Sequence, residues 1–229
     1  MSKITSSLEL ARYIDHSILK PNIIEPDIIK EIDNGIACNV ASICIMPHYL
    51  PLLVEKVKGT ETAACTVTGF PLGYTSLMEK IFNVRQSISM GAKEIDYVLN
   101  INDILSGKWA DVENEIGSVT HDCHSRDAKV KFIFENCYLQ DIHKIKLTRL
   151  CSDYDADWVK TSTGFGTSGA TLPDVCLMVQ NCSNGTQVKA AGGIKTLDDM
   201  LGFIDAGVTR VGCSLTKKIL EDAKVKFGK

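Results

Sequence analysis

The sequence has no run of basic residues. Its 229 residues include 25 Lys and Arg and 28 Asp and Glu, which gives a formal net charge of −3. Proteins that bind nucleic acid or membrane surfaces usually carry clustered basic charge, so neither is an expected partner. No apolar stretch approaches the ~18 consecutive residues that a membrane-spanning helix needs. These absences leave the globular enzymes and small-molecule binding proteins as the main classes.

The cysteines show no disulfide pattern and no paired spacing typical of a metal site. There are nine of them, scattered along the chain and without a CxxC pair. Such usage is typical of reduced thiols in the cytosol. The N-terminus, MSKITSSLELARY, interrupts its apolar residues with Lys3 and Glu9, which is not the pattern of a signal peptide. The sequence therefore predicts a cytoplasmic protein.

Short β-rich runs alternate with helix-length amphipathic segments along the chain, and no linker or low-complexity tract separates them. We predict strands near residues 13–18, 40–46, 63–67, 94–101, 130–135, 158–161, 187–190 and 209–213. We predict helices over residues 26–38, 77–90, 109–125, 141–151, 172–181 and 197–206. Helix-sized spacers between short strands indicate parallel βαβ units. Eight such strands in about 230 residues favour one (β/α)₈ TIM barrel over residues 1–229, with a helical extension at about 1–11. An open doubly wound sheet is the alternative.

The predicted strands are unusually polar on one face. Buried parallel strands usually read as continuous apolar runs, but here the alternation of side chains sorts charged residues to one side. A closed barrel would then gather three lysines and three carboxylates in its interior, and their near balance would limit the cost of burying charge. These residues are Lys131, Lys160, Lys189, Asp15, Asp96 and Glu135.

Two segments, DWVKTSTGFGTSGAT (157–171) and QVKAAGGIKT (187–196), each place an inward lysine just before a small, polar turn. Barrel active sites form at this end of the strands. A lysine nucleophile needs its neutral amine, and a neighbouring cation disfavours the protonated form. Lys160 and Lys189, on neighbouring strands, provide that arrangement. Asp96 could hold a water and relay protons.

The turns after the last three strands are candidates for binding an anion. Gly192-Gly193 and Gly212-Cys213-Ser214 follow strands seven and eight, whose loops commonly hold phosphate in these barrels. The pair Thr163-Gly164 and the side chain of Lys195 could complete such a site. A single Gly-Gly turn is weak evidence, but three polar turns on consecutive strands are more specific.

Five segments together resemble the deoxyribose-phosphate aldolase family: YIDHSILKP (13–21), CTVTGFPLG (65–73), GAKEIDYVLNI (91–101) and the two lysine segments above. The resemblance covers about residues 8–220. It implies reversible cleavage of 2-deoxy-D-ribose 5-phosphate into acetaldehyde and D-glyceraldehyde 3-phosphate through a lysine Schiff base. No metal or other cofactor is implied. The expected partners are a phosphorylated sugar and aldehydes, and a homodimer is the expected assembly.

The resemblance also implies roles for individual residues. Lys160 matches the Schiff-base lysine, Lys189 the lysine that perturbs it, and Asp96 the proton donor and acceptor. The interior residues Asp15, Cys44 and Lys131 are expected to line the site. Phosphate contacts are expected from Thr163, Gly164, Gly192, Gly193, Lys195, Gly212 and Ser214. Two positions depart from the family pattern: Lys195 stands where arginine is typical, and Leu215 where a small residue is common.

Three other features have simpler interpretations. The cluster 121–124, His-Asp-Cys-His, is too close in sequence to share one helix face, so we predict a solvated surface and no metal there. His16 has the opposite parity to Asp15 and is expected to face the helix layer. Cys44 lines the interior but has no histidine base nearby in sequence, so it is expected to be a small packing residue and not a nucleophile. A different phosphosugar barrel enzyme, or a non-catalytic sugar-phosphate binding protein, would also explain the phosphate loops and remains an alternative.

Overall fold

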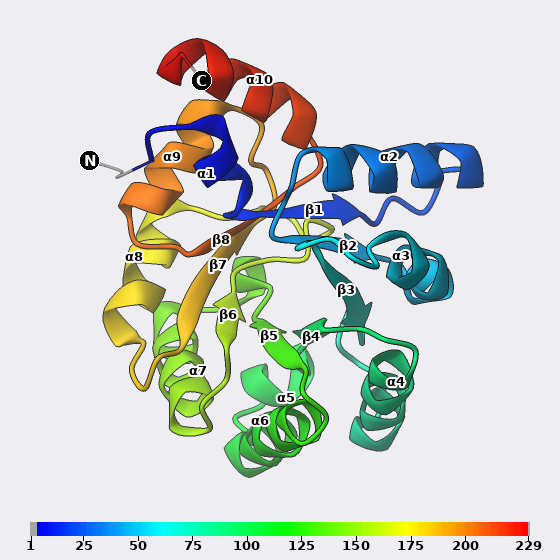
Figure 1. The fold of residues 1–229 in the computed structure, drawn as a ribbon. Coiled ribbons are helices and arrows are strands. Elements are labelled where there is room, and N and C mark those ends of the chain that lie inside the picture. Colours follow the sequence, from blue (N-terminus) through cyan, green and yellow to red (C-terminus); the bar gives the residue numbers. More distant parts are fainter. Residues whose placement is uncertain (1–3, 229) are drawn as a thin grey trace.

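The computed structural model describes residues 4–228, in which eight parallel strands close into a barrel. Each strand pairs with the next one in sequence, and β8 pairs with β1 (Figure 1). This confirms the predicted (β/α)₈ fold class and excludes the open sheet. The strands are β1 (Ile14–Ile18), β2 (Ser42–Ile45), β3 (Ala63–Thr68), β4 (Glu94–Val98), β5 (Lys129–Ile133), β6 (Trp158–Lys160), β7 (Gln187–Ala191) and β8 (Arg210–Cys213).

Helices surround the barrel as an outer layer (Figure 1). They are α1 (Ser7–Ala11), α2 (Glu25–Ala37), α3 (Leu50–Lys56), α4 (Leu77–Ser89), α5 (Ile101–Leu105), α6 (Trp109–His124), α7 (Asp141–Asp153), α8 (Leu172–Asn181), α9 (Leu197–Asp205) and α10 (Thr216–Phe227). Two 3-10 turns, η1 (Pro47–Tyr49) and η2 (Asn136–Tyr138), lie in the loops. Within residues 4–228, no helix is long and apolar enough to cross a membrane.

The N-terminal helical extension expected at about 1–11 corresponds to α1, which packs against α10. Ser6 begins this helix, since its hydroxyl accepts a hydrogen bond from the backbone N–H of Glu9. Residues 1–3 of the expected extension lie outside the described part of the chain.

Local capping explains where several helices begin. Thr196 caps α9 in a reciprocal capping box with Asp199. Thr171 caps α8, and Pro173 follows it in the first turn, where its missing N–H costs no hydrogen bond. The loops that leave β6 and β7 at the mouth of the barrel end at these two caps.

The strands separate two different environments. Their outward side chains, such as Ile43, Tyr97, Phe132 and Val211, are fully buried against the helices and form the hydrophobic core. His16 also faces outward, as predicted: its Nδ1 lies 2.8 Å from the hydroxyl of Thr216 on α10. The inward side chains are largely polar, so the functional site forms inside the barrel.

One sequence-based boundary was wrong, and one prediction about a surface cluster was wrong in part. The fourth strand was predicted to reach residue 101, but β4 ends at Val98 and Asn100 caps the short helix α5, which was not predicted. The side chain of Asn100 accepts hydrogen bonds from the N–H groups of Asn102 and Asp103, which stabilises the start of a helix and not a longer strand.

The prediction that residues 121–124 form a solvated surface cluster was wrong in part. Asp122 is buried beneath two arginines and Cys123 lies in the core, because the last turn of α6 still packs on the barrel.

Candidate active site

Asp96, on β4, is the centre of a buried ion network inside the barrel. Its Oδ2 accepts hydrogen bonds from Nζ of Lys160 and Nζ of Lys189, each at 2.7 Å. Its Oδ1 accepts from Nζ of Lys131 at 2.8 Å and from Sγ of Cys65 at 3.3 Å. One carboxylate therefore connects three lysines that come from three consecutive strands, β5, β6 and β7.

A second set of charged groups lies behind this centre. Asp15 accepts hydrogen bonds from Ser42 Oγ at 2.6 Å and Lys189 Nζ at 2.5 Å, and it also contacts Arg210. Glu94 bridges Lys131 Nζ, at 2.6 Å, and Arg210 Nη1, at 3.0 Å. All the carboxylate oxygens of the network are thus held by donors, which buried charges require.

The network fixes the protonation of most of its members. Burial alone would raise the pKa of Asp96 and of Asp15, but the surrounding lysines outweigh it and hold both values well below their usual range. Burial disfavours the charged form of Lys131 and Lys189, yet the neighbouring carboxylates raise the pKa of both. Lys131 and Lys189 therefore remain cations at neutral pH.

The charge count leaves one cation too many. Across the described residues, the network contains four cationic side chains and three carboxylates: Lys131, Lys160, Lys189, Arg210, Asp15, Glu94 and Asp96. Lys160 contacts a single carboxylate, whereas Lys189 contacts two and Lys131 three. Loss of one proton would balance the buried charge. Lys160 is the lysine of the network with the fewest anionic partners.

Lys160 is also the member of the network that lines the cavity among the loops after the strands. The cavity, of about 290 Å³, opens at the carboxyl ends of the strands. Lys160 is only 3% exposed and lies at the floor. The other lining residues are Ser17, Leu19, Lys20, Thr163, Gly164, Phe165, Ala191, Gly192, Gly193, Ile194, Gly212, Cys213 and Ser214.

The structure sorts the predicted site residues into two layers. The predicted phosphate-binding residues Thr163, Gly164, Gly192, Gly193, Gly212 and Ser214 all line the cavity. Lys195 is exposed and is not among the lining residues. The predicted residues Lys189, Asp96, Asp15, Lys131 and Cys44 are buried in the interior and do not line the cavity.

Glu135 was predicted to join the interior carboxylates, and this was wrong. It follows the end of β5 in a left-handed conformation, with φ of 44°, which interrupts the alternation of the strand. Its carboxylate instead accepts hydrogen bonds from the N–H and hydroxyl of Thr163 and so holds the loop after β6. Glu94 takes the expected place in the network.

Sequence reasoning missed Arg210 as a member of the network. A signal was available, since Arg210 stands two residues before Gly212 and shares its inward face on β8. Ser42 on β2 pairs with Asp15 on the neighbouring strand β1, so strand alternation would also have predicted it.

The two glycine loops touch each other at the mouth. A Cβ on Gly169 would lie 2.2 Å from the carbonyl oxygen of Gly192, so only glycine fits there. The N–H of Ala170 donates to the carbonyl oxygens of Ala191 and Gly192 at 3.0 and 3.1 Å. The loop after β6 therefore supports the Gly192-Gly193 turn from behind and leaves its other side to the cavity.

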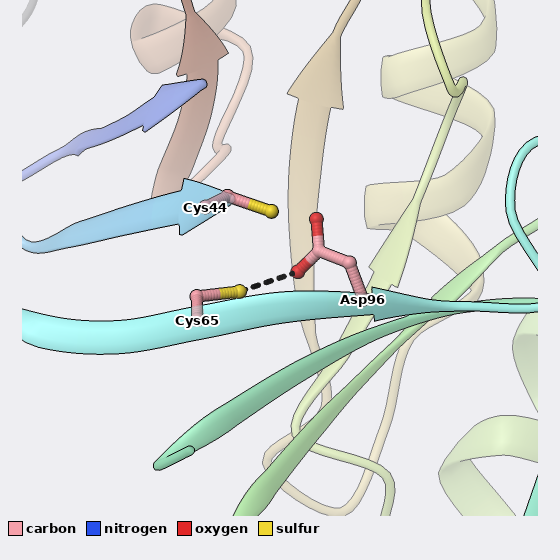
Figure 2. A group of neighbouring side chains, drawn as sticks. All are labelled: Cys44, Cys65 and Asp96. Atoms are coloured by element: carbon pink, nitrogen blue, oxygen red, sulfur yellow. Dashed lines mark hydrogen bonds between the residues drawn. The ribbon is translucent and has the colours of Figure 1, made fainter. Parts of the chain in front are cut away.

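Cys44, Cys65 and Asp96 form the group of described side chains with spacing suited to a metal ion, their donor atoms lying within 4.8 Å of one another (Figure 2). Two observations disfavour that use. Nζ of Lys131 lies 3.3 Å from Cys65 Sγ and places a positive charge at the group. Burial also raises the pKa of Cys65 well above its usual value, whereas metals bind the thiolate. The donor set therefore fits a metal cation poorly.

A closed barrel with a buried lysine at the floor of a glycine-rich cavity is the arrangement of enzymes that react with carbonyl compounds through an amine. Comparison with protein families narrows this class. The family described as DeoC/LacD family aldolase matches residues 10–219. The chain belongs to this family.

Individual relatives extend over nearly the whole chain. A deoxyribose-phosphate aldolase of Rhodopirellula baltica is 46% identical over 220 residues, which cover 96% of this chain and 91% of the relative. A deoxyribose-phosphate aldolase of Caldanaerobacter subterraneus is 41% identical over 225 residues, which cover 98% of this chain and 97% of the relative. Among solved structures, the tetrameric deoxyribose phosphate aldolase of Aeropyrum pernix superposes with a TM-score of 0.88 at 29% identity, covering 98% of this chain and 94% of that one.

Proposed function

We propose that this protein is a class I deoxyribose-phosphate aldolase, which reversibly cleaves 2-deoxy-D-ribose 5-phosphate into acetaldehyde and D-glyceraldehyde 3-phosphate. The observation that carries the proposal is the position of Lys160. It lies at the floor of the cavity and shares Asp96 Oδ2 with the cation of Lys189. The relatives described above carry the name deoxyribose-phosphate aldolase, which agrees with the proposed substrate.

The first step is attack by the amine of Lys160 on the aldehyde carbon, C1, of the open-chain sugar. Attack requires a neutral amine, and the other three cations of the network, Lys131, Lys189 and Arg210, balance its three carboxylates without a charge on Lys160. Loss of water then gives an iminium bonded to the lysine nitrogen. The iminium withdraws electrons from C2 and replaces a Lewis acid as the electron sink.

Cleavage of the C2–C3 bond requires removal of the proton from the C3 hydroxyl. Asp96 alone is a weak base, because its pKa is held well below the usual range. We therefore assign the transfer to a water that carries the proton from this hydroxyl to Asp96, whose Oδ2 is hydrogen-bonded to Lys189. The electron pair of the C2–C3 bond moves to the iminium, leaving an enamine and releasing glyceraldehyde 3-phosphate. Protonation at C2 and hydrolysis then release acetaldehyde and restore the lysine.

The other end of the cavity suits the phosphate group. Gly192, Gly193 and Ser214 line it, and Ser214 lies two residues before the start of α10. Backbone N–H groups at a helix start and in a glycine turn attract an anion. The cavity thus offers an amine at one end and anion-binding groups at the other, which is the polarity of a phosphorylated aldehyde.

Borohydride trapping tests this function directly. Reduction in the presence of acetaldehyde should add one two-carbon unit to the peptide that contains Lys160. Lys160→Arg should abolish both the adduct and acetaldehyde release, since a guanidinium stays protonated and cannot attack a carbonyl. An adduct on Lys189 or Lys131 would show that the nucleophile is wrong, and activity without any adduct would exclude the Schiff-base mechanism.

The proposal includes a cytoplasmic homodimer. All nine cysteines are free in the structure, which suits a reducing compartment. Met78 and Phe82, one turn apart on α4, are 76% and 64% exposed, and exposed apolar groups of this kind are typical of subunit contacts. Light scattering at assay concentrations checks the assembly, and a monomeric mass would refute the dimer.

A further inference from the structure

The mouth of the catalytic cavity carries a cation that the sequence patterns did not assign to the site. We propose that Lys20, just beyond the end of β1, is the residue whose ammonium binds the substrate phosphate and so determines the preference for phosphorylated sugars. This inference rests on the proposed aldolase function and adds a specificity residue to it.

The charge distribution of the cavity supports this role. Its lining contains two cationic side chains, Lys160 and Lys20, and no carboxylate. Lys160 is buried at the floor and Lys20 is exposed at the rim. A linear substrate that places its aldehyde at Lys160 would therefore extend its phosphate toward the second cation. A dianion at that rim meets attraction and no anionic side chain.

Strand pairing brings Lys20 beside the phosphate-binding turn. β1 pairs with β8, with Asp15 opposite Gly212 and His16 opposite Cys213. The segments that leave these two strands run next to each other, so Ser17, Leu19 and Lys20 line the cavity together with Ser214. Lys20 thus lines the cavity from the side of β1, and the turn that carries Ser214 lines it from the side of β8.

The ammonium of Lys20 is available for a ligand. Within residues 4–228, its side chain has no hydrogen bond or ion pair to the rest of the protein. A lysine that already belonged to an ion pair would have to exchange that partner for the phosphate. Lys20 has no such partner to lose, and its flexible side chain can follow a phosphate into place.

Lys195, the cation expected from the glycine segment, lies next to the start of α9. Asp199 accepts hydrogen bonds from the hydroxyl and N–H of Thr196 and from the N–H of Lys195; together with the charge of Lys195, these lower the pKa of Asp199. The charge of Lys195 therefore acts on the start of α9. Its side chain does not line the cavity.

Kinetics on two substrates test the assignment. With 2-deoxyribose 5-phosphate, Lys20→Ala should lower kcat/KM about tenfold, chiefly through KM, as expected for loss of one charged hydrogen bond at an exposed site. With unphosphorylated 2-deoxyribose the same variant should change less than about twofold. Lys20→Arg should restore most of the loss. Lys58→Ala, an exposed lysine in the loop before β3, is the matched control.

Two further measurements separate phosphate binding from a general structural effect. Inorganic phosphate should inhibit the wild type competitively, and its inhibition constant should rise about tenfold in Lys20→Ala. Borohydride trapping of acetaldehyde on Lys160 should proceed at the wild-type rate in this variant, since the trapping agent carries no phosphate.

Two outcomes would overturn the assignment. Equal losses on both sugars in Lys20→Ala would show a structural role, and a larger phosphate-specific loss in Lys195→Ala would return the role to that lysine. Failure of the aldolase function itself looks different: the wild type would cleave neither sugar and would form no adduct with acetaldehyde.

Discussion

Replacing Lys189 by leucine distinguishes the roles of Lys160 and Lys189 most clearly. Because both Nζ atoms contact the same oxygen of Asp96 at 2.7 Å, they lie no farther apart than twice that distance. Two unit charges at about 5 Å repel by about 3 kcal/mol at an effective dielectric constant of about 20. Removing the cation of Lys189 should therefore slow adduct formation on Lys160 about a hundredfold at fixed pH.

The assay is the rate of borohydride-trapped adduct with acetaldehyde, measured from pH 7 to pH 10. In Lys189→Leu the rate at pH 7 should fall about a hundredfold and then rise roughly tenfold with each pH unit, as the remaining proton is titrated. The adduct should stay on Lys160. Lys160→Arg should form no adduct at any pH in the same range.

Stability must be followed in parallel, because the substitution removes a cation from Asp15 and Asp96. Breaking a buried pair costs about 3 to 5 kcal/mol. The lower end applies here, since each carboxylate keeps two other cationic partners. Circular dichroism and urea unfolding should show a folded but less stable variant. A folded variant that traps acetaldehyde at the wild-type rate at pH 7, or that shows no alkaline recovery, would refute the electrostatic role of Lys189.

Three other predictions follow from the geometry. Exhaustive chelation should leave acetaldehyde release unchanged; activity lost on chelation and restored by zinc would contradict the iminium mechanism. Because the pKa of Asp15 is lowered in the folded chain, its carboxylate stabilises the fold above about pH 4, and this contribution is lost as the pH falls further. Asp15→Asn should thus flatten the acid side of the stability curve measured by urea unfolding between pH 3 and pH 6, and an unchanged slope would argue against it. Gly169→Ala should lower kcat/KM about a hundredfold by displacing Gly192, whereas Gly202→Ala, which meets no atom within 4 Å, should be nearly silent.

The alternation of side chains along strands predicted much of the site. It predicted Asp15, Asp96 and the three lysines on the inner face, and all of them meet there. The rule works because a strand has a period of two and a closed barrel has a single interior. The barrel itself was predictable from the regular spacing of strands and helices.

The same rule stops at the strand ends, where the remaining differences lie. Glu135 has the expected parity, but its left-handed backbone turns it toward Thr163. Asn100 leaves β4 to cap a helix. Lys20 lies in the segment 13–21, which resembles the aldolase family, but it follows the end of β1. The alternation of side chains along a strand therefore does not predict its direction. Loop geometry depends on contacts between distant segments, such as Gly169 with Gly192, which no local pattern encodes.

The ion network also constrains the order in which the molecule can be made. Asp15 is held by Lys189 and Arg210, which follow it by 174 and 195 residues. During synthesis on a ribosome, Asp15, Glu94 and Asp96 all emerge before Lys189 and Arg210. Until those two residues arrive, the three carboxylates outnumber the cations available to them, and closing a dry interior around them is unfavourable. We therefore expect the early strands to stay open and hydrated until β7 and β8 emerge. These last strands then close the barrel and supply the positive charge that the carboxylates lack.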